Sequence, residues 1–174
     1  MPEVHPDDAD VIESAVRRRV VELATPSVEI VDCDPALADT AAFCTAYGYS
    51  LDDSANAIVV IGKADPPRFV MCLVLASSRL DVNNAVRRRL GVKKASFASA
   101  DATAQLTGMV VGGVTPFAAP SDVPIWVDAA VMRRDRIVVG GGSRSCKVVG
   151  PPSMLTELTN VEVIDGLAFR PSTD

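Results

Sequence analysis

The pattern of apolar and polar positions divides the chain into short strands, most of them in adjacent pairs, with single helices between the pairs. Two dense apolar runs, at residues 56–62 and 68–76, are separated by a short polar turn and predict a β-hairpin. Two further runs, at 136–139 and 145–149, flank the glycine-rich stretch 140–144 and predict a second hairpin. Paired strands with interposed helices favour a mixed α+β fold over a regular parallel βαβ array.

Helices are expected where capping residues and helical spacing coincide. Asp34 followed by Pro35 has the sequence of an N-cap and a first helical residue, and Gly48 is typical of a helix end. The expected helices cover residues 7–24, 35–47, 81–90, 99–107 and 151–158. Further single strands are expected at residues 28–32, 95–98, 125–127 and 161–164.

The stretch 106–128 is the one around which we expect the other elements to be organised. Its glycines, Gly108, Gly112 and Gly113, let the backbone take positive φ and let a ligand approach bare N–H groups. Its prolines stiffen the turns between them. Such a loop can hold a ligand by its main chain, or it can serve only as a connection between two strands.

The order of motifs along this stretch resembles the signature of the YbaK/ProX-type aminoacyl-tRNA editing domains. The motifs are Thr107-Gly108, Gly112-Gly113, Thr115-Pro116 and an apolar strand that ends in Asp128. The resemblance extends from about residue 28 to about residue 168. It implies a curved, mixed, largely antiparallel and barrel-like sheet with helices packed around it.

The length and composition fit one such domain. A chain of 174 residues, 48% hydrophobic and 22% charged, is long enough for one well-packed core and short for two. We expect a single editing-like domain over residues 1–174, with an N-terminal helical extension at 1–27 and a frayed tail at 170–174.

The resemblance also implies a pocket that binds the charged end of a tRNA. The first wall would hold the aminoacyl-adenosine through Gly112, Gly113, Val114, Thr115, Pro116 and Phe117. The second wall would be formed by Gly140, Gly141, Ser143 and Arg144. Arg144 is the expected phosphate contact, because its guanidinium can pair with two oxygens at once.

Two positions depart from the family pattern. Asn56 stands where relatives commonly have a lysine, and Lys147 stands where a relative of the free-standing bacterial type has an acidic residue. We expect Asn56, Gly112 and Lys147 to be catalytic. Asn56 would orient the ester or amine, Gly112 would offer a backbone N–H to the oxyanion, and Lys147 would replace the missing charge near the substrate. The alternative is an exposed lysine and an asparagine that only caps a strand.

The charge distribution bears on the partner. A formal net charge of −5 argues against a general nucleic-acid binder, although basic residues gather at 17–19, 87–94 and 133–136. The expected partners are a mischarged tRNA and an aminoacyl-tRNA synthetase. The predicted tRNA contacts are Arg87, Arg88, Arg89, Lys93 and Lys94.

The remaining composition predicts no metal site, no cofactor and no membrane segment. The four cysteines are widely spaced without a C-x-x-C pair, and the single histidine is His5, so we expect buried, reduced thiols and no zinc site. No apolar run approaches the ~20 residues of a membrane helix, and the acidic N-terminus does not resemble a secretory signal. The expected location is the cytoplasm, and the oligomeric state is left open.

The sequence thus predicts a free-standing aminoacyl-tRNA deacylase that removes a small mischarged amino acid, with Cys, Ala and Ser as the possible identities. One alternative is a non-catalytic binder of aminoacyl-tRNA or of a nucleotide-like ligand. Another is a protein–protein adaptor with a vestigial pocket.

Overall fold

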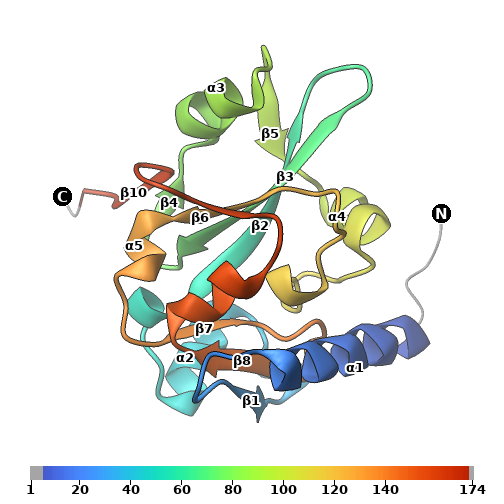
Figure 1. Cartoon of the computed structure of the whole chain (residues 1–174), viewed down its shortest axis with the longest axis vertical. Coiled ribbons are helices and arrows are strands. Elements are labelled where there is room, and N and C mark those ends of the chain that lie inside the picture. Colours follow the sequence, from blue (N-terminus) through green and yellow to red (C-terminus); the bar gives the residue numbers. More distant parts are fainter. Residues whose placement is uncertain (1–5, 173–174) are drawn as a thin grey trace.

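The structure is a computed structural model of the 174-residue chain, and it describes residues 6–172 (Figure 1). His5 and the last two residues of the expected frayed tail lie outside the described residues. The helices are α1 (Pro6–Glu22), α2 (Thr40–Tyr47), α3 (Arg87–Leu90), α4 (Ala100–Thr107) and α5 (Ala129–Met132).

The strands are short, as the apolar pattern predicts. They are β1 (Glu29–Asp32), β2 (Ala55–Gly62), β3 (Arg68–Leu75), β4 (Arg79–Leu80), β5 (Ala95–Phe97), β6 (Ile125–Asp128), β7 (Ile137–Gly140), β8 (Cys146–Gly150), β9 (Val161–Ile164) and β10 (Ala168–Phe169). Four 3₁₀ segments and one π-helical segment complete the elements. The 3₁₀ segments are η1 (Pro35–Leu37), η2 (Leu51–Asp53), η4 (Pro116–Ala118) and η5 (Pro152–Glu157), and the π-helical segment is η3 (Val82–Val86).

The strands form a five-stranded sheet in the order β5-β2-β3-β6-β9, a three-stranded sheet β1-β8-β7 and a two-stranded sheet β10-β4. All pairs are antiparallel except β3–β6 and β6–β9. The predicted mixed, largely antiparallel α+β fold is therefore confirmed, although the described sheets do not close into a barrel. Both predicted hairpins form, with Gly62 opposite Arg68 and Gly140 opposite Lys147.

The central hairpin separates two hydrophobic clusters. Alternate side chains of β2 and β3 point to opposite faces of the sheet. Val59, Met71 and Leu73 face the cluster that packs against α1 and β8, whereas Val60 and Val70 face the cluster under η3 and α3. The sheet thus has a helix-covered face on each side (Figure 1).

The prediction of one continuous helix over residues 35–47 is wrong. Asp34 caps the turn η1 by accepting a hydrogen bond from the Ala36 N–H at 2.9 Å, as expected. The chain then leaves the helical conformation at Asp39, with ψ 138°, and α2 begins afresh at Thr40. The break leaves the carbonyl of Ala38 outside any helix.

Two smaller expectations also change. Residues 152–157 form a 3₁₀ segment in place of the expected α-helix. The two-residue strands β4 and β10, which pair with each other, were not predicted because two residues carry no periodicity. None of the described helices is both long enough and apolar enough to cross a membrane.

All four cysteines are free and buried, as predicted. Burial raises the pKa of Cys72 to about 12 and that of Cys146 to about 11. Because the thiolate is the reactive form, neither thiol is suited to act as a nucleophile at neutral pH.

Asp128, at the end of β6, holds three elements together. It is 5% exposed, and its carboxylate accepts hydrogen bonds from the Ala130 N–H of α5 at 2.8 Å and from the Ala168 N–H of β10 at 2.9 Å. The acidic residue that closes the sequence signature therefore has a structural role here.

Asp128→Ala should lower the free energy of unfolding by about 2 kcal/mol, because two main-chain donors would be left without a charged acceptor. Asp128→Asn, which keeps one acceptor oxygen, should have about half that effect. Urea unfolding measures both values, and Asp122→Ala, at an exposed turn, is the control. Equal stability of the Asp128→Ala and Asp122→Ala variants would contradict the role of Asp128.

Candidate functional site

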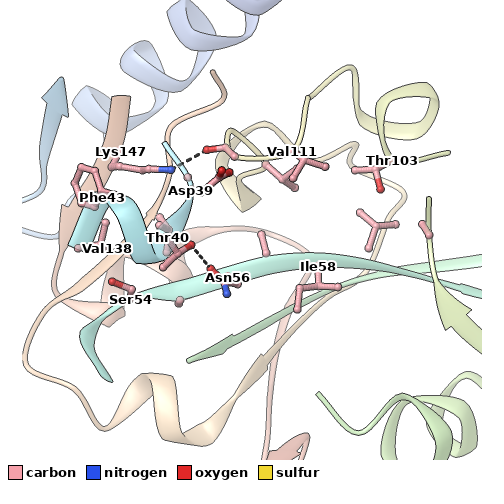
Figure 2. A pocket seen from close by; sticks show the side chains of 18 residues that line it. Asp39, Thr40, Phe43, Ser54, Asn56, Ile58, Thr103, Val111, Val138 and Lys147 are labelled. Carbon is pink, nitrogen blue, oxygen red and sulfur yellow. Dashed lines mark hydrogen bonds between the residues drawn. The ribbon is translucent and has the colours of Figure 1, made fainter. Parts of the chain in front are cut away.

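A cavity of about 320 Å³ opens along one edge of β2 (Figure 2). Its lining comes from α2, β2, the loop 111–114 and the β7–β8 hairpin. Five of the residues predicted from the sequence line it: Asn56, Gly112, Val114, Gly140 and Lys147. Segments that are far apart in the chain therefore meet at one site.

The cavity exists because the outer edge of β2 is only partly paired. On one side, β5 pairs with residues 60–62 of β2, and the Ala98 N–H donates to the Val59 carbonyl. At the other end of the same edge, a single bridge joins Ser54 to Val138 of β7. Between these contacts, main-chain groups of Ala57 face away from β3, because alternate residues of a strand direct their hydrogen-bonding groups to opposite edges.

Asn56 is fixed by a neighbour on α2. Its Oδ1 accepts a hydrogen bond from the Thr40 hydroxyl at 2.7 Å (Figure 2). In this orientation the NH₂ group of Asn56 is directed away from Thr40 and is a donor at the cavity. A neutral donor thus lies on β2 at the cavity.

Lys147 is a buried cation. Its side chain is 5% exposed, and its Nζ donates to the carbonyls of Ala38 and Gly112, both at 2.7 Å. The ammonium also lies 5.7 Å from the centre of the Phe43 ring. The lysine therefore ties the segment before α2 to the glycine loop, and the break before α2 makes the Ala38 carbonyl available to it.

Arg144 makes the same connection closer to the surface. Its Nε donates to the Pro35 carbonyl at 3.1 Å, and its Nη1 approaches the Asp39 carboxylate at 3.2 Å and the Val111 carbonyl at 2.9 Å. We call Arg144, Lys147 and their five oxygen acceptors the cation clasp. The clasp joins residues 35–39 to residues 111–112 across one end of the cavity.

The clasp determines how the main chain of Gly112 is presented. Gly112 has φ +93°, and a Cβ atom at this position would collide with the Arg144 guanidinium. The Val111 carbonyl points to Arg144, so the Gly112 N–H, on the opposite side of the trans peptide, points away from Arg144. The next N–H, that of Gly113, closes a turn onto the Val110 carbonyl at 3.0 Å. The Gly112 N–H makes no main-chain hydrogen bond within residues 6–172, so it is a donor that this loop can offer to a ligand.

The other glycines allow backbones to pack closely. A Cβ on Gly113 would overlap the main chain of Ser143, and one on Gly140 would overlap the Val114 carbonyl. Gly141 packs in the same way against Cys146. Gly113 and Gly140 thus let the loop pack closely on the β7–β8 hairpin, and Gly141 allows close packing within that hairpin.

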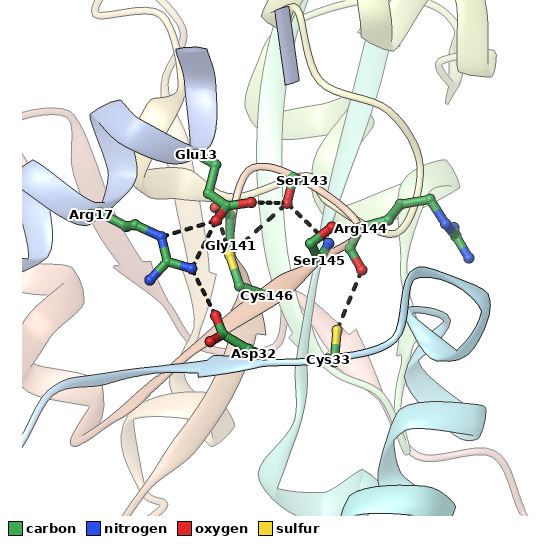
Figure 3. Close-up of polar contacts among 9 residues, drawn as sticks. All are labelled: Glu13, Arg17, Asp32, Cys33, Gly141, Ser143, Arg144, Ser145 and Cys146. Atoms are coloured by element: carbon green, nitrogen blue, oxygen red, sulfur yellow. Dashed lines mark hydrogen bonds and ion pairs between the residues drawn. The ribbon is translucent and has the colours of Figure 1, made fainter. Parts of the chain in front are cut away.

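Ser143 lies on the α1 side of the turn and does not line the cavity (Figure 3). Its hydroxyl donates to the Glu13 carboxylate and accepts from the Ser145 N–H. Burial acts to raise the pKa of Glu13, but the hydrogen bonds from Ser143 and Arg17 outweigh it and lower the pKa. Arg17 also pairs with Asp32 of β1. These contacts attach the β7–β8 turn, which contains Arg144, to α1.

Three further predicted pocket residues lie beneath the loop. Thr115 and Pro116 are buried, and Phe117 belongs to the cluster that packs against α1. The Thr115 hydroxyl accepts from the Phe117 N–H at 3.4 Å and so begins the turn η4. Neither this threonine nor the two residues after it lines the cavity.

The predicted tRNA contacts lie on the α3 side of the large sheet. Arg89 pairs with Glu162 and stands 5.4 Å from the centre of the Trp126 ring. Arg87 is half-buried, with its Nε bound to the Asn83 carbonyl. Arg88, Lys93 and Lys94 are exposed.

Sequence reasoning did not select several cavity residues as site residues. Asp39 is a carboxylate at the cavity, and Phe43, Ser54 and Thr103 also line it. The only sequence signal for Asp39 was that an aspartate, which is a common N-cap residue, stands inside the run expected to be one helix. The others carry no local pattern that separates them from core residues.

A sequence model of the aminoacyl-tRNA editing domain family matches residues 34–158. The chain belongs to this family. The matched range contains the cavity and the cation clasp but not α1. The resemblance read from the glycine loop is therefore confirmed.

Individual relatives are distant. The Bacillus subtilis (strain 168) protein YwhH, described as uncharacterized, is 26% identical over 112 residues, which span 64% of this chain and 69% of the relative. A solved structure described as a candidate trans-editing enzyme for prolyl-tRNA synthetase is 21% identical, with a TM-score of 0.74 over 97% of this chain and 99% of the other. The hypothetical protein APE2540 is also 21% identical, with a TM-score of 0.75 over 90% of this chain and 98% of the other. At these identities, the two structures establish the editing-domain fold.

The buried position of Lys147 predicts a pH-dependent stability. Burial lowers the pKa of Lys147 below its ordinary value of 10.5. The unfolded chain therefore binds the Lys147 proton more tightly than the folded protein does. At neutral pH the folded protein bears the whole free-energy cost of burying the charge, and this cost falls as the pH rises toward 10.5, because the folded protein loses the proton first. The difference in free energy of unfolding, parent minus Lys147→Met, should increase between about pH 7 and about pH 10.

Urea unfolding at several pH values measures this difference. Lys93→Met, at an exposed lysine, is the matched control, for which the difference should not change with pH. A pH-independent difference for Lys147→Met would show that its ammonium is not buried in solution.

Proposed function

We propose that this protein is an aminoacyl-tRNA deacylase that removes a small mischarged amino acid, with Cys, Ala and Ser as the candidate substrates. Membership of the editing-domain family supports deacylation of tRNA at the general level. The observation that carries the proposal is the cavity beside the Gly112 N–H, whose direction the cation clasp fixes. The partner would be a mischarged tRNA, met in the cytoplasm, with a synthetase as the source of the error.

The proposed chemistry depends on main-chain donors. Attack on an ester carbonyl develops negative charge on its oxygen, and a preorganised N–H stabilises that charge by roughly 3 kcal/mol. Gly112 would supply this donor. An aminoacyl ester is already activated, so a positioned water or the neighbouring ribose hydroxyl can be the nucleophile without a strong base.

Asn56 would bind the substrate through its NH₂ group. Thr40 already engages the amide oxygen, so the amide is held in one orientation before the substrate arrives. A neutral amide donor can approach the ester or the amino group, whereas a lysine at this position would repel a substrate ammonium.

Lys147 would act through the loop and not on the substrate. The sequence led us to expect that the Lys147 charge lies near the substrate, in place of the missing lysine at position 56. In the structure, its Nζ lies 2.7 Å from each of two carbonyl oxygens. An acidic residue at 147 would face the same oxygens and repel them. We therefore propose Lys147 and Arg144 as positioning residues for Gly112, and leave Gly112 and Asn56 as the groups that meet the substrate.

A panel of tRNAs mischarged with alanine, serine or cysteine tests the function. The purified protein should release the amino acid from at least one of them, and EDTA should leave the rate unchanged because the proposed chemistry uses no metal. Binding without release would favour the alternative, a non-catalytic binder of aminoacyl-tRNA, for which the neutral Asn56 is the supporting observation. If the protein neither releases the amino acid nor binds the tRNA, both proposed functions are refuted.

Gly112→Ala should lower kcat by about a hundredfold, because the strained backbone and the displaced Arg144 misalign the oxyanion donor. Gly166→Ala is the matched control: Gly166 has φ +73°, and nothing lies within 4 Å of a Cβ there. Gly166→Ala therefore introduces a similar backbone strain at a position that does not line the cavity. Equal kcat values for the two variants would remove Gly112 from the mechanism.

The basic residues near α3 are proposed as the tRNA contacts. Replacement of Arg87, Arg88, Lys93 and Lys94 by alanine should flatten the slope of log affinity against log salt by up to about 0.9 for each phosphate that is no longer neutralised. Filter binding with deacylated tRNA at several salt concentrations measures the slope. An unchanged slope and affinity would place the RNA on another surface.

A further inference from the structure

Phe97 is an aromatic residue that the proposed chemistry does not use. It ends the edge strand β5, and its side chain is 58% exposed. A large apolar ring in water at a strand end contributes little to the core. Its position relative to the cavity suggests what it binds.

The register of β5 places Phe97 on the α3 side of the sheet. Phe97 is opposite Val60 in an antiparallel pair, and opposed residues point to the same face. Val60 belongs to the cluster under α3, and β5 lies against the π-helical segment η3 just before α3 (Figure 1). The ring therefore stands on the face that carries the basic residues.

Phe97 also adjoins the cavity. The next residue, Ala98, lines the cavity and donates its N–H to the Val59 carbonyl at 2.9 Å. On β2, the side chain of Ile58 points to the same face of the sheet as that of Val60, and Ile58 also lines the cavity. Phe97 is therefore at the rim where the cavity meets the α3 face.

Three exposed lysines lie at the start of β5, at the end of the strand away from Phe97. Lys93 and Lys94 precede it on the same segment, and Lys63 lies beside them, since its N–H donates to the Lys94 carbonyl at 2.8 Å. All three are exposed, and none forms an ion pair within residues 6–172. An exposed ring a few residues from unpaired positive charges is the arrangement that proteins use for single-stranded nucleic acid, where the charges track the phosphates and a base stacks on the ring.

We propose that Phe97 is a stacking platform for an unpaired nucleobase of the tRNA acceptor end. The proposal rests on the proposed function, because it requires that the 3′-terminal ester enters the cavity and that the preceding unpaired nucleotides leave across its rim. The unpaired lysines at the start of the same strand favour RNA over an apolar partner. Stacking is tolerant of base identity, so Phe97 adds affinity for the acceptor end without selecting the tRNA.

Binding of a deacylated RNA hairpin with a single-stranded 3′ CCA end, labelled at its 5′ end, tests the proposal without any chemistry. Phe97→Leu keeps an apolar side chain but removes the π-face, and should weaken binding by about tenfold. Phe97→Trp should bind at least as tightly as the parent. Phe169→Leu is the matched control, because Phe169 is 53% exposed on β10, and it should bind like the parent.

Salt and substrate design separate stacking from charge. The Phe97 variants should keep the salt slope of the parent, since every phosphate-binding lysine remains in place, whereas Lys93→Ala and Lys94→Ala should flatten it. With a mischarged tRNA, Phe97→Leu should raise KM by about the same factor and leave kcat within about twofold. A hairpin whose unpaired nucleotides are abasic should bind the parent and Phe97→Leu equally.

The outcomes distinguish the two proposals. Binding that depends on Phe97 without any deacylation would sustain the platform as a site for unpaired RNA and overturn the enzyme. Deacylation with Phe97→Leu equal to the parent in RNA affinity and KM would sustain the enzyme and overturn the platform. Equally weakened binding in Phe97→Leu and Phe169→Leu would also overturn it, since a surface aromatic far from the rim would then matter as much.

Discussion

The burial of the Lys147 ammonium is the constraint on which the site depends. An isolated charge in a protein interior is unfavourable by several kcal/mol unless oxygens replace its water. Here two carbonyls and an aromatic face do so, and neither carbonyl belongs to a regular element. Ala38 is freed by the break before α2, and Gly112 takes a positive φ. The irregular backbone on both sides of the cavity is thus stabilised by one cation.

This constraint works because the rest of the fold supplies rigid attachment points. Lys147 is on β8, which is held between β1 and β7, and the turn before it is fixed to α1 through Ser143 and Glu13. Asp128 fixes the far end of the parallel strand β6 to α5 and β10. The outer edge of β2 is left incompletely paired between these attachment points, and the cavity lies there. An unpaired strand edge is a liability in most proteins, and here it lies within a walled cavity.

Local patterns predicted the local structure well. Dense apolar runs on either side of a short turn predicted both hairpins, and the helix expected at residues 99–107 forms as α4, because caps and turns are decided by a few adjacent residues. The break at Asp39 was not predictable in this way, since the partner that uses the freed carbonyl is over a hundred residues away. The glycine loop was predicted as a site, but Gly113 and Gly140 serve contact between main chains that the sequence does not show to be close. Lys147 could be placed on the inner face of its strand by alternation, whereas its oxygen partners depend on the tertiary fold.

The electrostatics of the clasp bear on how such a site can select its substrate. The Lys147 charge is directed at two carbonyls, and Asp39 is paired with Arg144, so these three formal charges of the clasp are already engaged. Asn56, deeper along β2, is neutral and held by Thr40. A substrate entering this cavity therefore meets fixed dipoles and an apolar surface more than free charge. Fixed dipoles stabilise a developing oxyanion without reorganising, and an apolar wall discriminates by volume. Discrimination by volume alone is modest, about ten- to two-hundredfold per methylene, and it requires walls that hold their separation. The clasp joins two of these walls, residues 35–39 and residues 111–112, by hydrogen bonds.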